Sequence, residues 1–319
     1  MQSSGDPKSG PGSEPVLRIG TRGSPLALTQ TGMVRAALAA AHGLAEAKIA
    51  VSTIRTSGDT IQDRPLAEVG GKGLFTKEIE EGLLDGSIDL AVHSAKDLPT
   101  ALPHGLIIAA VLPREDPRDA FISGKAKSLR ALAPGAVLGT ASLRRQALVK
   151  HLRPDIEVVP LRGNVETRLR KLADGEVDAT LLALAGLKRL GLAKAATAIL
   201  PVDECLPAVG QGIVAIEARA DDERTHAFLR AINHPDTATA LVAERAFLTV
   251  LDGSCRTPIA GHARLEDGKL HFRGLIARPD GKASFEAVRE GDPIDAAKLG
   301  ADAGHELKRR AGTDFFADL

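Results

Sequence analysis

The chain has 319 residues, 44% of them hydrophobic, which is enough to bury the cores of about two or three domains. Basic and acidic residues number 41 each, and this zero net charge argues against a general nucleic-acid-binding protein. The only cysteines, Cys205 and Cys255, argue against a disulfide framework and for a reducing cytoplasm. Neither has metal-ligating side chains at a usable spacing, so we expect no metal.

The N-terminal residues are unlike the rest of the chain. Residues 1–14 are rich in Ser, Gly and Pro and lack an apolar stretch, so we expect a flexible tail rather than a signal peptide. No run of about 18 apolar residues occurs anywhere, and we therefore expect no membrane partner.

The first predicted elements are a strand followed by a helix. Residues 16–20 form an apolar run typical of a strand, and Ser24 with Pro25 is typical of a helix N-terminus. Backbone N–H groups at such a junction bind carboxylates. Arg22 stands beside them, so this junction is a candidate anion site.

A long polar segment follows the strand predicted at 49–54. Residues 57–73 contain four glycines and one proline and show no periodicity. Segments of this kind are usually lids or disordered loops. A helix is predicted directly after it, at 74–85.

Residues 89–99 carry the strongest candidate for chemistry. Residues 90–92 read as a buried strand, and the chain then turns polar with Ser94, Lys96 and Asp97. The carboxyl ends of strands in open α/β sheets are where ligands bind. Asp97 therefore lies where a catalytic group would be expected. For such a loop taken alone, however, a solvated turn is the favoured interpretation.

The sequence contains a candidate internal duplication. Residues 83–98 align without a gap with 172–187, and the two segments share a first Leu, Asp-Gly, Asp and a last Leu. Such matches also arise by chance in a chain rich in Leu and Ala. A real duplication predicts two similar α/β lobes that face each other across a cleft. Gly186 occupies the position that matches Asp97, so only the first lobe has the acid.

The second predicted lobe is locally basic. Residues 140–171 contain eight Lys and Arg against three Asp and Glu, a local net charge of +5. Six of the eight are Arg, which recognises carboxylates and phosphates through two parallel hydrogen bonds. Several of them stand at helix starts, which favours a polyanion-binding cleft wall over a solvated basic face.

The C-terminal part of the chain reads as a compact α/β unit, with a helix followed by strands at 258–264 and 269–277. Cys255 lies beside Arg256 on the loop before these strands. A cysteine on an irregular loop beside a cation is more often reactive than one in a core. Cys205 has acidic neighbours and is expected to be inert.

Eight motifs carry a resemblance to a known family. In order, they are RGSPLA (22–27), GGKGLF (70–75), HSAKD (93–97), REDPRDAF (114–121), GTASLRRQ (139–146), LRGN (161–164), VGQG (209–212) and GSCRTPI (253–259). Each motif alone is weak, but eight in this order are highly specific. The sequence therefore resembles the porphobilinogen deaminases, also called hydroxymethylbilane synthases, over nearly the whole chain.

The resemblance implies a cytoplasmic, monomeric transferase of tetrapyrrole and heme biosynthesis. Such an enzyme joins four porphobilinogen units head to tail into hydroxymethylbilane and releases ammonia at each step. The resemblance also implies a dipyrromethane cofactor held through a thioether. By position, the thioether falls on Cys255 and the catalytic carboxylate on Asp97.

The resemblance also implies further site residues. Matches to the family's cofactor contacts are Lys96, Ser94, Thr140, Ser142, Arg144, Arg145, Arg162, Arg168 and Arg189. Matches to its substrate contacts are Arg22, Ser24, Lys72 and Phe75. Ala141 stands where many relatives have Ser, and Glu68 where some have Lys, but neither position is the acid or the thiol.

The family fold implies an α/β chain of three domains. The first two resemble the lobes of a type II periplasmic binding protein, and the third is small. We expect a first domain at 15–112 plus 208–232 with the catalytic Asp, and a second at 113–207 with the arginines. The third, at 233–319, would carry the attachment cysteine.

Two other functions share part of this pattern. A non-catalytic two-lobed anion-binding protein would use the lobes and the arginines, but it has no use for Cys255 or a third domain. A Cys-dependent acyl transferase needs a base, and neither His262 nor His271 stands at a compelling spacing. Only the deaminase predicts a dipyrromethane increment in the intact mass.

Overall fold

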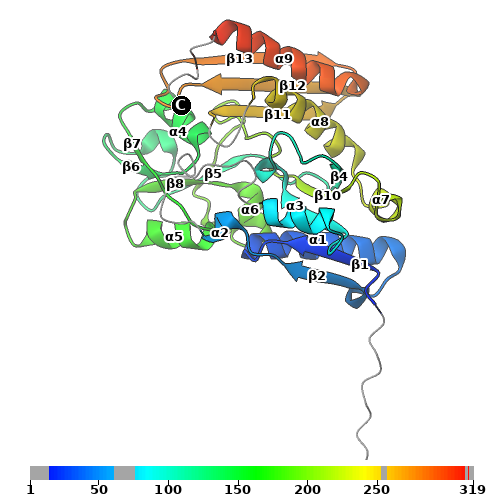
Figure 1. Ribbon diagram of the computed structural model, residues 1–319. Coiled ribbons are helices and arrows are strands. Elements are labelled where there is room, and N and C mark those ends of the chain that lie inside the picture. Colours follow the sequence, from blue (N-terminus) through cyan, green and yellow to red (C-terminus); the bar gives the residue numbers. More distant parts are fainter. Residues whose placement is uncertain (1–13, 61–75, 253–256, 313–314, 316–319) are drawn as a thin grey trace, which may run out of the picture.

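The computed structural model describes residues 14–60, 76–252, 257–312 and 315 (Figure 1). Two sheets of five strands and one of three strands form its framework. In Figure 1 the sheet with β1 and β2 lies at the bottom, the sheet with β6 to β8 lies to the left, and the C-terminal unit lies on top. None of the helices in these ranges combines the length and apolarity that a membrane span requires.

The first lobe is a mixed sheet covered by helices on both faces. Its order is β2-β1-β3-β10-β4, with β1 to β3 parallel and β10 antiparallel to both β3 and β4. Leu90 and Val92 pack with helix α1, whereas Ala91 packs with α3 on the other face, as the two-residue period of a strand requires. The bounds are β1 (Leu17–Thr21), α1 (Pro25–His42), β2 (Ile49–Thr53), α2 (Ser57–Thr60), α3 (Lys77–Leu84), β3 (Leu90–Ser94), β4 (Leu106–Val111), β10 (Val214–Arg219) and α7 (Glu223–Arg230).

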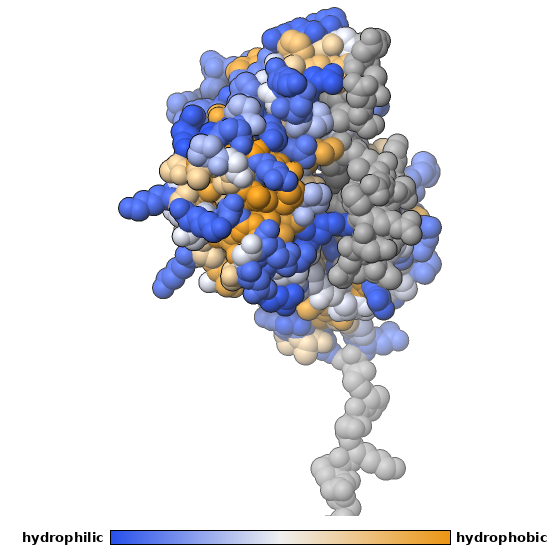
Figure 2. Space-filling model, turned by 90° about the vertical axis from the view of Figure 1, so that its left-hand side faces the viewer, coloured by the Kyte–Doolittle hydropathy of each residue, from blue (hydrophilic) through white to orange (hydrophobic). Residues whose placement is uncertain are grey.

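The second lobe repeats this architecture. Its sheet order is β7-β6-β8-β5-β9, with β6 parallel to β7 and β8, and β5 antiparallel to β8 and β9. Figure 2 shows a hydrophobic area on the face of the molecule that includes this lobe, surrounded by hydrophilic residues. The bounds are β5 (Asp119–Ile122), β6 (Val137–Gly139), α4 (Leu143–Leu152), β7 (Glu157–Val159), α5 (Val165–Ala173), β8 (Ala179–Ala183), α6 (Leu184–Arg189) and β9 (Ala198–Ile199).

The matching strand orders support the internal duplication. Across each sheet, three parallel strands lie next to one antiparallel strand. The chain enters that antiparallel strand directly after it has crossed from the other lobe. β3 and β8 occupy corresponding positions, and each leads into a short helical segment. In the first lobe this segment is the 3₁₀ turn η2 (Ala95–Asp97), and in the second it is α6.

The C-terminal unit packs two helices on an antiparallel sheet. Its sheet comprises β11 (Ile259–Glu266), β12 (Lys269–Ala277) and β13 (Ser284–Gly291), and its helices are α8 (Pro235–Val250) and α9 (Ala296–Ala311). Phe247 and Phe272 form its centre, with ring centroids 5.1 Å apart. The strands predicted at 258–264 and 269–277 are β11 and β12.

The described part of the polar segment 57–73 differs from the prediction. Ser57–Thr60 forms the short helix α2 instead of a loop. A contact distant in the sequence stabilises its start, because the Ser57 backbone N donates to Glu78 Oε1 at 2.9 Å. Residues 61–75, with Lys72 and Phe75, lie outside the described residues.

The close packing of α8 on α9 leads to a stability prediction. A Cβ at Gly300 would overlap the carbonyl oxygen of Ala243, so Gly300→Ala must push the two helices apart. We expect a loss of about 1–3 kcal/mol in the free energy of unfolding. Gly32 in α1 has open space around its Cβ position, and Gly32→Ala is expected to gain about 0.5–1 kcal/mol. Urea unfolding, monitored by circular dichroism, measures the free energy of unfolding of both variants. Equal values for Gly300→Ala and Gly32→Ala would contradict the close packing of α8 on α9.

Candidate active site

Asp97 lies at the end of η2, directly after β3, where the sequence predicts it. The Ala95 backbone N donates to Ile213 O at 3.0 Å, which fixes this turn to the segment that leads into β10. Gly210 has φ +72°, and a Cβ there would stand 3.1 Å from the backbone of Ala95 and Lys96. Glycine therefore lets the returning chain pack directly on the turn that carries Asp97.

Lys96 is half-buried beside Asp97, and its Nζ lies 3.5 Å from Gln211 Oε1. Burial lowers the pKa of Lys96 to about 8. The charges of Arg145 and Arg144 lower this pKa further, whereas the Asp97 carboxylate raises it. Gln211 also donates from Nε2 to Asp119, the carboxylate that pairs with Arg144 and Arg145, so these arginines of the second lobe lie close to Lys96 of the first.

Arg168 on α5 faces the same place from the second lobe. Burial and the nearby charge of Arg145 lower the pKa of Arg168 to about 10, and the Asp97 carboxylate acts in the opposite direction. The Arg168 Nε donates to Gly163 O at 2.8 Å. The fold thus brings together Lys96, Asp97, Arg144, Arg145 and Arg168, which we call the interlobe site.

Arg144 and Arg145 are almost fully buried, with 5% of each residue exposed. Both form ion pairs with Asp119 at the start of β5: Arg144 Nη2 lies 2.6 Å and Arg145 Nη2 2.8 Å from its carboxylate oxygens. Arg144 Nη1 also donates to Leu206 O at 2.7 Å. The two arginines are therefore fixed in position by the protein itself.

Four buried guanidinium nitrogens of the second lobe find no hydrogen-bond acceptor among the described residues. They are the Nε atoms of Arg144, Arg145 and Arg189 and the Nη1 atom of Arg162. An unpaired buried donor costs free energy that an anionic ligand can recover. Arg189 also donates from Nη2 to Gly212 O at 2.7 Å, in the segment that returns to the first lobe.

The predicted hydroxyl residues hold the local backbone. Ser24 Oγ accepts from Ala27 N at 3.3 Å and Ser142 Oγ from Arg145 N at 3.4 Å, so both cap helices. Thr140 Oγ1 accepts from Ser142 N at 3.2 Å. Gln30 Nε2 donates to Ser94 Oγ at 2.9 Å. Arg22 is half-buried at the predicted junction between β1 and α1, and Cys255 lies outside the described residues.

A buried histidine and a buried glutamate lie side by side on the strands beneath the interlobe site. His93 on β3 and Glu217 on β10 lie 3.1 Å apart, between Nε2 and Oε2, and both are buried. Burial raises the pKa of Glu80 on the covering helix α3, and the charge of Glu217 raises it further. Glu80 and Glu217 were not predicted from the sequence, because their proximity depends on the packing of α3 against strands far away in the chain.

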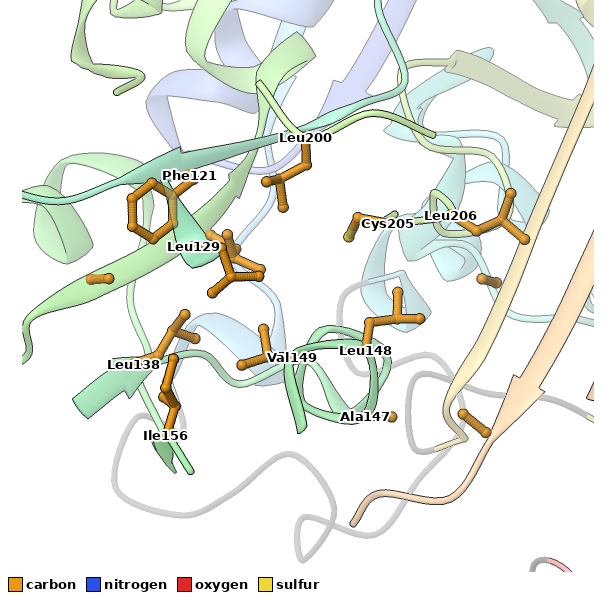
Figure 3. Packing of buried hydrophobic residues seen from close by; sticks show 14 of the residues in the cluster. Phe121, Leu129, Leu138, Ala147, Leu148, Val149, Ile156, Leu200, Cys205 and Leu206 are labelled. Atoms are coloured by element: carbon orange, nitrogen blue, oxygen red, sulfur yellow. The ribbon is translucent and has the colours of Figure 1, made fainter. Parts of the chain in front are cut away.

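Cys205 belongs to the second lobe's hydrophobic cluster, where Figure 3 shows it beside Leu206. Burial raises the pKa of the Cys205 thiol to about 12, and the Asp119 carboxylate contributes to this rise. We expect iodoacetamide at about pH 8 to leave Cys205 unlabelled in the folded protein and to label it after unfolding. Peptide mass spectrometry measures the labelling of Cys205 in the folded and in the unfolded protein. Equal labelling of the two forms would contradict the buried position of Cys205.

Within the described part of the chain, no group of three or more His, Cys, Asp and Glu side chains could hold a metal ion. The interlobe site is instead a set of fixed cations around one acid. Such a site can bind several carboxylates and stabilise a positive charge that develops close to Asp97.

Comparisons with known proteins show to which family the chain is related. Residues 17–227 match the family model described as porphobilinogen deaminase, dipyromethane cofactor binding domain, and residues 238–309 match the porphobilinogen deaminase C-terminal domain. Porphobilinogen deaminase of Nitrobacter hamburgensis is 62% identical over 99% of this chain and 98% of its own. That of Nitrobacter winogradskyi is 65% identical over 93% of this chain and 94% of its own.

Among solved structures, the periplasmic aliphatic sulphonate binding protein SsuA from Escherichia coli aligns with a TM-score of 0.41 and 18% identity. The alignment covers 73% of this chain and 69% of that chain. The two family models together span both lobes and most of the C-terminal unit. The chain belongs to the porphobilinogen deaminase family.

Proposed function

We propose that Asp97 is the catalytic carboxylate of this enzyme and that the cations around it bind the carboxylates of the cofactor and of the growing product. As a family member, the chain is a transferase that joins four porphobilinogen units head to tail into hydroxymethylbilane, releasing ammonia, on a dipyrromethane primer. One observation carries the proposal: Asp97 directly follows Lys96, whose Nζ lies 3.5 Å from Gln211, and Gln211 donates to Asp119, the partner of Arg144 and Arg145.

The residues of the interlobe site fit dipyrromethane. Each ring derived from porphobilinogen carries an acetate and a propionate, and the buried, unpartnered guanidinium nitrogens are the donors that carboxylates prefer. When bound, the cofactor supplies the free pyrrole α-carbon to which the first porphobilinogen is joined. The residues proposed to hold it are Ser94, Lys96, Thr140, Ser142, Arg144, Arg145, Arg162, Arg168 and Arg189.

Asp97 acts on the charge that develops during the reaction. When ammonia leaves the aminomethyl group of porphobilinogen, positive charge develops on the pyrrole nitrogen. A fixed carboxylate near that nitrogen stabilises the transition state more than the ground state, and it can relay the proton released afterwards. Lys96 and Arg168 meanwhile orient the carboxylates of the rings through charge-assisted hydrogen bonds.

Other assignments rest on motif position and are part of the same proposal. Cys255 is proposed to carry the thioether, and Arg22, Ser24, Lys72 and Phe75 to contact the incoming substrate. The domain limits proposed are 15–112 with 208–232, 113–207 and 233–319. A cytoplasmic location rests on the cysteine usage and the family resemblance, and a monomeric state rests on the resemblance alone.

A product assay tests this function. Purified protein incubated with porphobilinogen is expected to release four ammonia molecules for each hydroxymethylbilane formed, as measured by an ammonia assay and by mass spectrometry of the product. Binding of porphobilinogen without ammonia release would instead support a non-catalytic anion-binding protein.

A further inference from the structure

Asp119 is a fully buried carboxylate at the start of β5, inside the motif 114–121, and no role was predicted for it from the sequence. Its two oxygens accept hydrogen bonds from Arg144 and Arg145 at 2.6 and 2.8 Å. The Cys205 thiol donates to it at 3.3 Å. Gln211 also donates to it, from Nε2, at 3.0 Å, so four side chains converge on one negative charge.

Gln211 connects this carboxylate to the other lobe. Its side chain is buried in the segment that returns from the second lobe to β10. Its Nε2 donates to Asp119 and also to Pro117 O at 2.6 Å, while its Oε1 lies 3.5 Å from Lys96 Nζ. The amide of Gln211 thus lies between the cation of the first lobe and the carboxylate of the second.

We propose that Asp119 is a positioning residue of the interlobe site: it fixes Arg144 and Arg145 directly and fixes Lys96 through the amide of Gln211. Three cations would otherwise repel one another in a buried space. Counted with Asp97 and Arg168, the site has two protein carboxylates among four cations, and the remaining net positive charge attracts the carboxylates of a ligand. The statement that the site attracts ligand carboxylates rests on the proposed function. The effect of the Asp119 charge on the pKa of Lys96 does not.

The charges around Lys96 show how the coupling can be measured. The paired arginines hold the pKa of Asp119 far below its usual value, so its charge persists at every working pH. That charge raises the pKa of Lys96, as does Asp97, against the lowering by burial and by Arg145 and Arg144. Removing the Asp119 charge must therefore lower the pKa of Lys96 below about 8.

The experiment follows the reductive methylation of Lys96 across pH in the full-length protein as purified, by peptide mass spectrometry. The midpoint of the wild type is the reference value for the variants. In Asp119→Asn the midpoint should fall by about half a pH unit or more. Asp178→Asn is the matched control, because Asp178 is also a second-lobe carboxylate with structural hydrogen bonds, one of them from Val137 N at 2.7 Å. Its midpoint should equal that of the wild type.

A second variant keeps the proposal testable if Asp119→Asn does not fold. Gln211→Met removes the connecting amide and leaves both arginine contacts of Asp119 in place. Its midpoint should also fall, because Lys96 loses its acceptor. An unchanged midpoint in either folded variant, or an equal fall in Asp178→Asn, overturns the proposal. Methylation does not require turnover, so an inactive protein with the expected shifts would reject the proposed function alone.

Discussion

Replacing Asp97 with Asn is expected to lower the turnover number about 100- to 1,000-fold, the usual cost of removing one charge-stabilising group. Asn has nearly the same shape and can keep the η2 turn, but it cannot stabilise the positive charge on the pyrrole nitrogen. Cofactor content and the unfolding transition should therefore stay at wild-type values. Ammonia release in a single turnover measures the effect directly.

Asp174→Asn is a suitable control for this variant, because Asp174 is an exposed carboxylate that follows α5 in the other lobe. It should turn over at the wild-type rate. If Asp97→Asn kept at least half of the wild-type rate with full cofactor content, the assignment of Asp97 as the catalytic carboxylate would be wrong.

Removing the Glu244 carboxylate is expected to cost about 3–5 kcal/mol of stability, because Arg114, whose side chain is only 12% exposed, then loses its counter-charge. Glu244 on α8 is fully buried, and its Oε1 lies 2.5 Å from Arg114 Nη1. It also accepts from Gly210 N at 2.6 Å and from Ala263 N at 2.7 Å. Arg114 and Gly210 belong to the two segments that connect the lobes with each other, and Ala263 belongs to the C-terminal unit. The Glu244 carboxylate therefore links both of these segments to the C-terminal unit.

Urea unfolding of Glu244→Leu, Arg114→Leu and the double variant measures this contribution. The double variant should lose less free energy of unfolding than the sum of the two single losses, because neither charge is left without its partner. Glu266→Ala breaks an exposed pair with Arg264 and should cost at most about 1 kcal/mol. A cost for Glu244→Leu as small as that of Glu266→Ala would contradict the structural role of this carboxylate.

The sequence predicted the elements whose signals are local. Ser24 and Pro25 mark the start of α1, and the apolar run before Ser94 marks β3. The alignment of 83–98 with 172–187 predicted two similar lobes, and the two sheets share one strand order. These features depend on neighbouring residues and on periodicity, which a single sequence contains.

The sequence did not predict the partners of the charged residues. Asp119 pairs with arginines 25 and 26 residues away, and Glu244 pairs with an arginine 130 residues away. Helix α2 was missed for the same reason, since Glu78 stabilises its start from 21 residues away. Such contacts arise only when the lobes and the C-terminal unit have packed, and no local pattern encodes them.

The central claim is that one cysteine, Cys255, carries a covalently bound dipyrromethane primer for the reaction at Asp97. The intact mass of the protein tests it most directly, with Cys255→Ser and Cys205→Ser measured beside the wild type. The account predicts a mass increment of one dipyrromethane in the wild type and in Cys205→Ser, and the bare polypeptide mass in Cys255→Ser. An increment that persists in Cys255→Ser, or that disappears in Cys205→Ser, would contradict it.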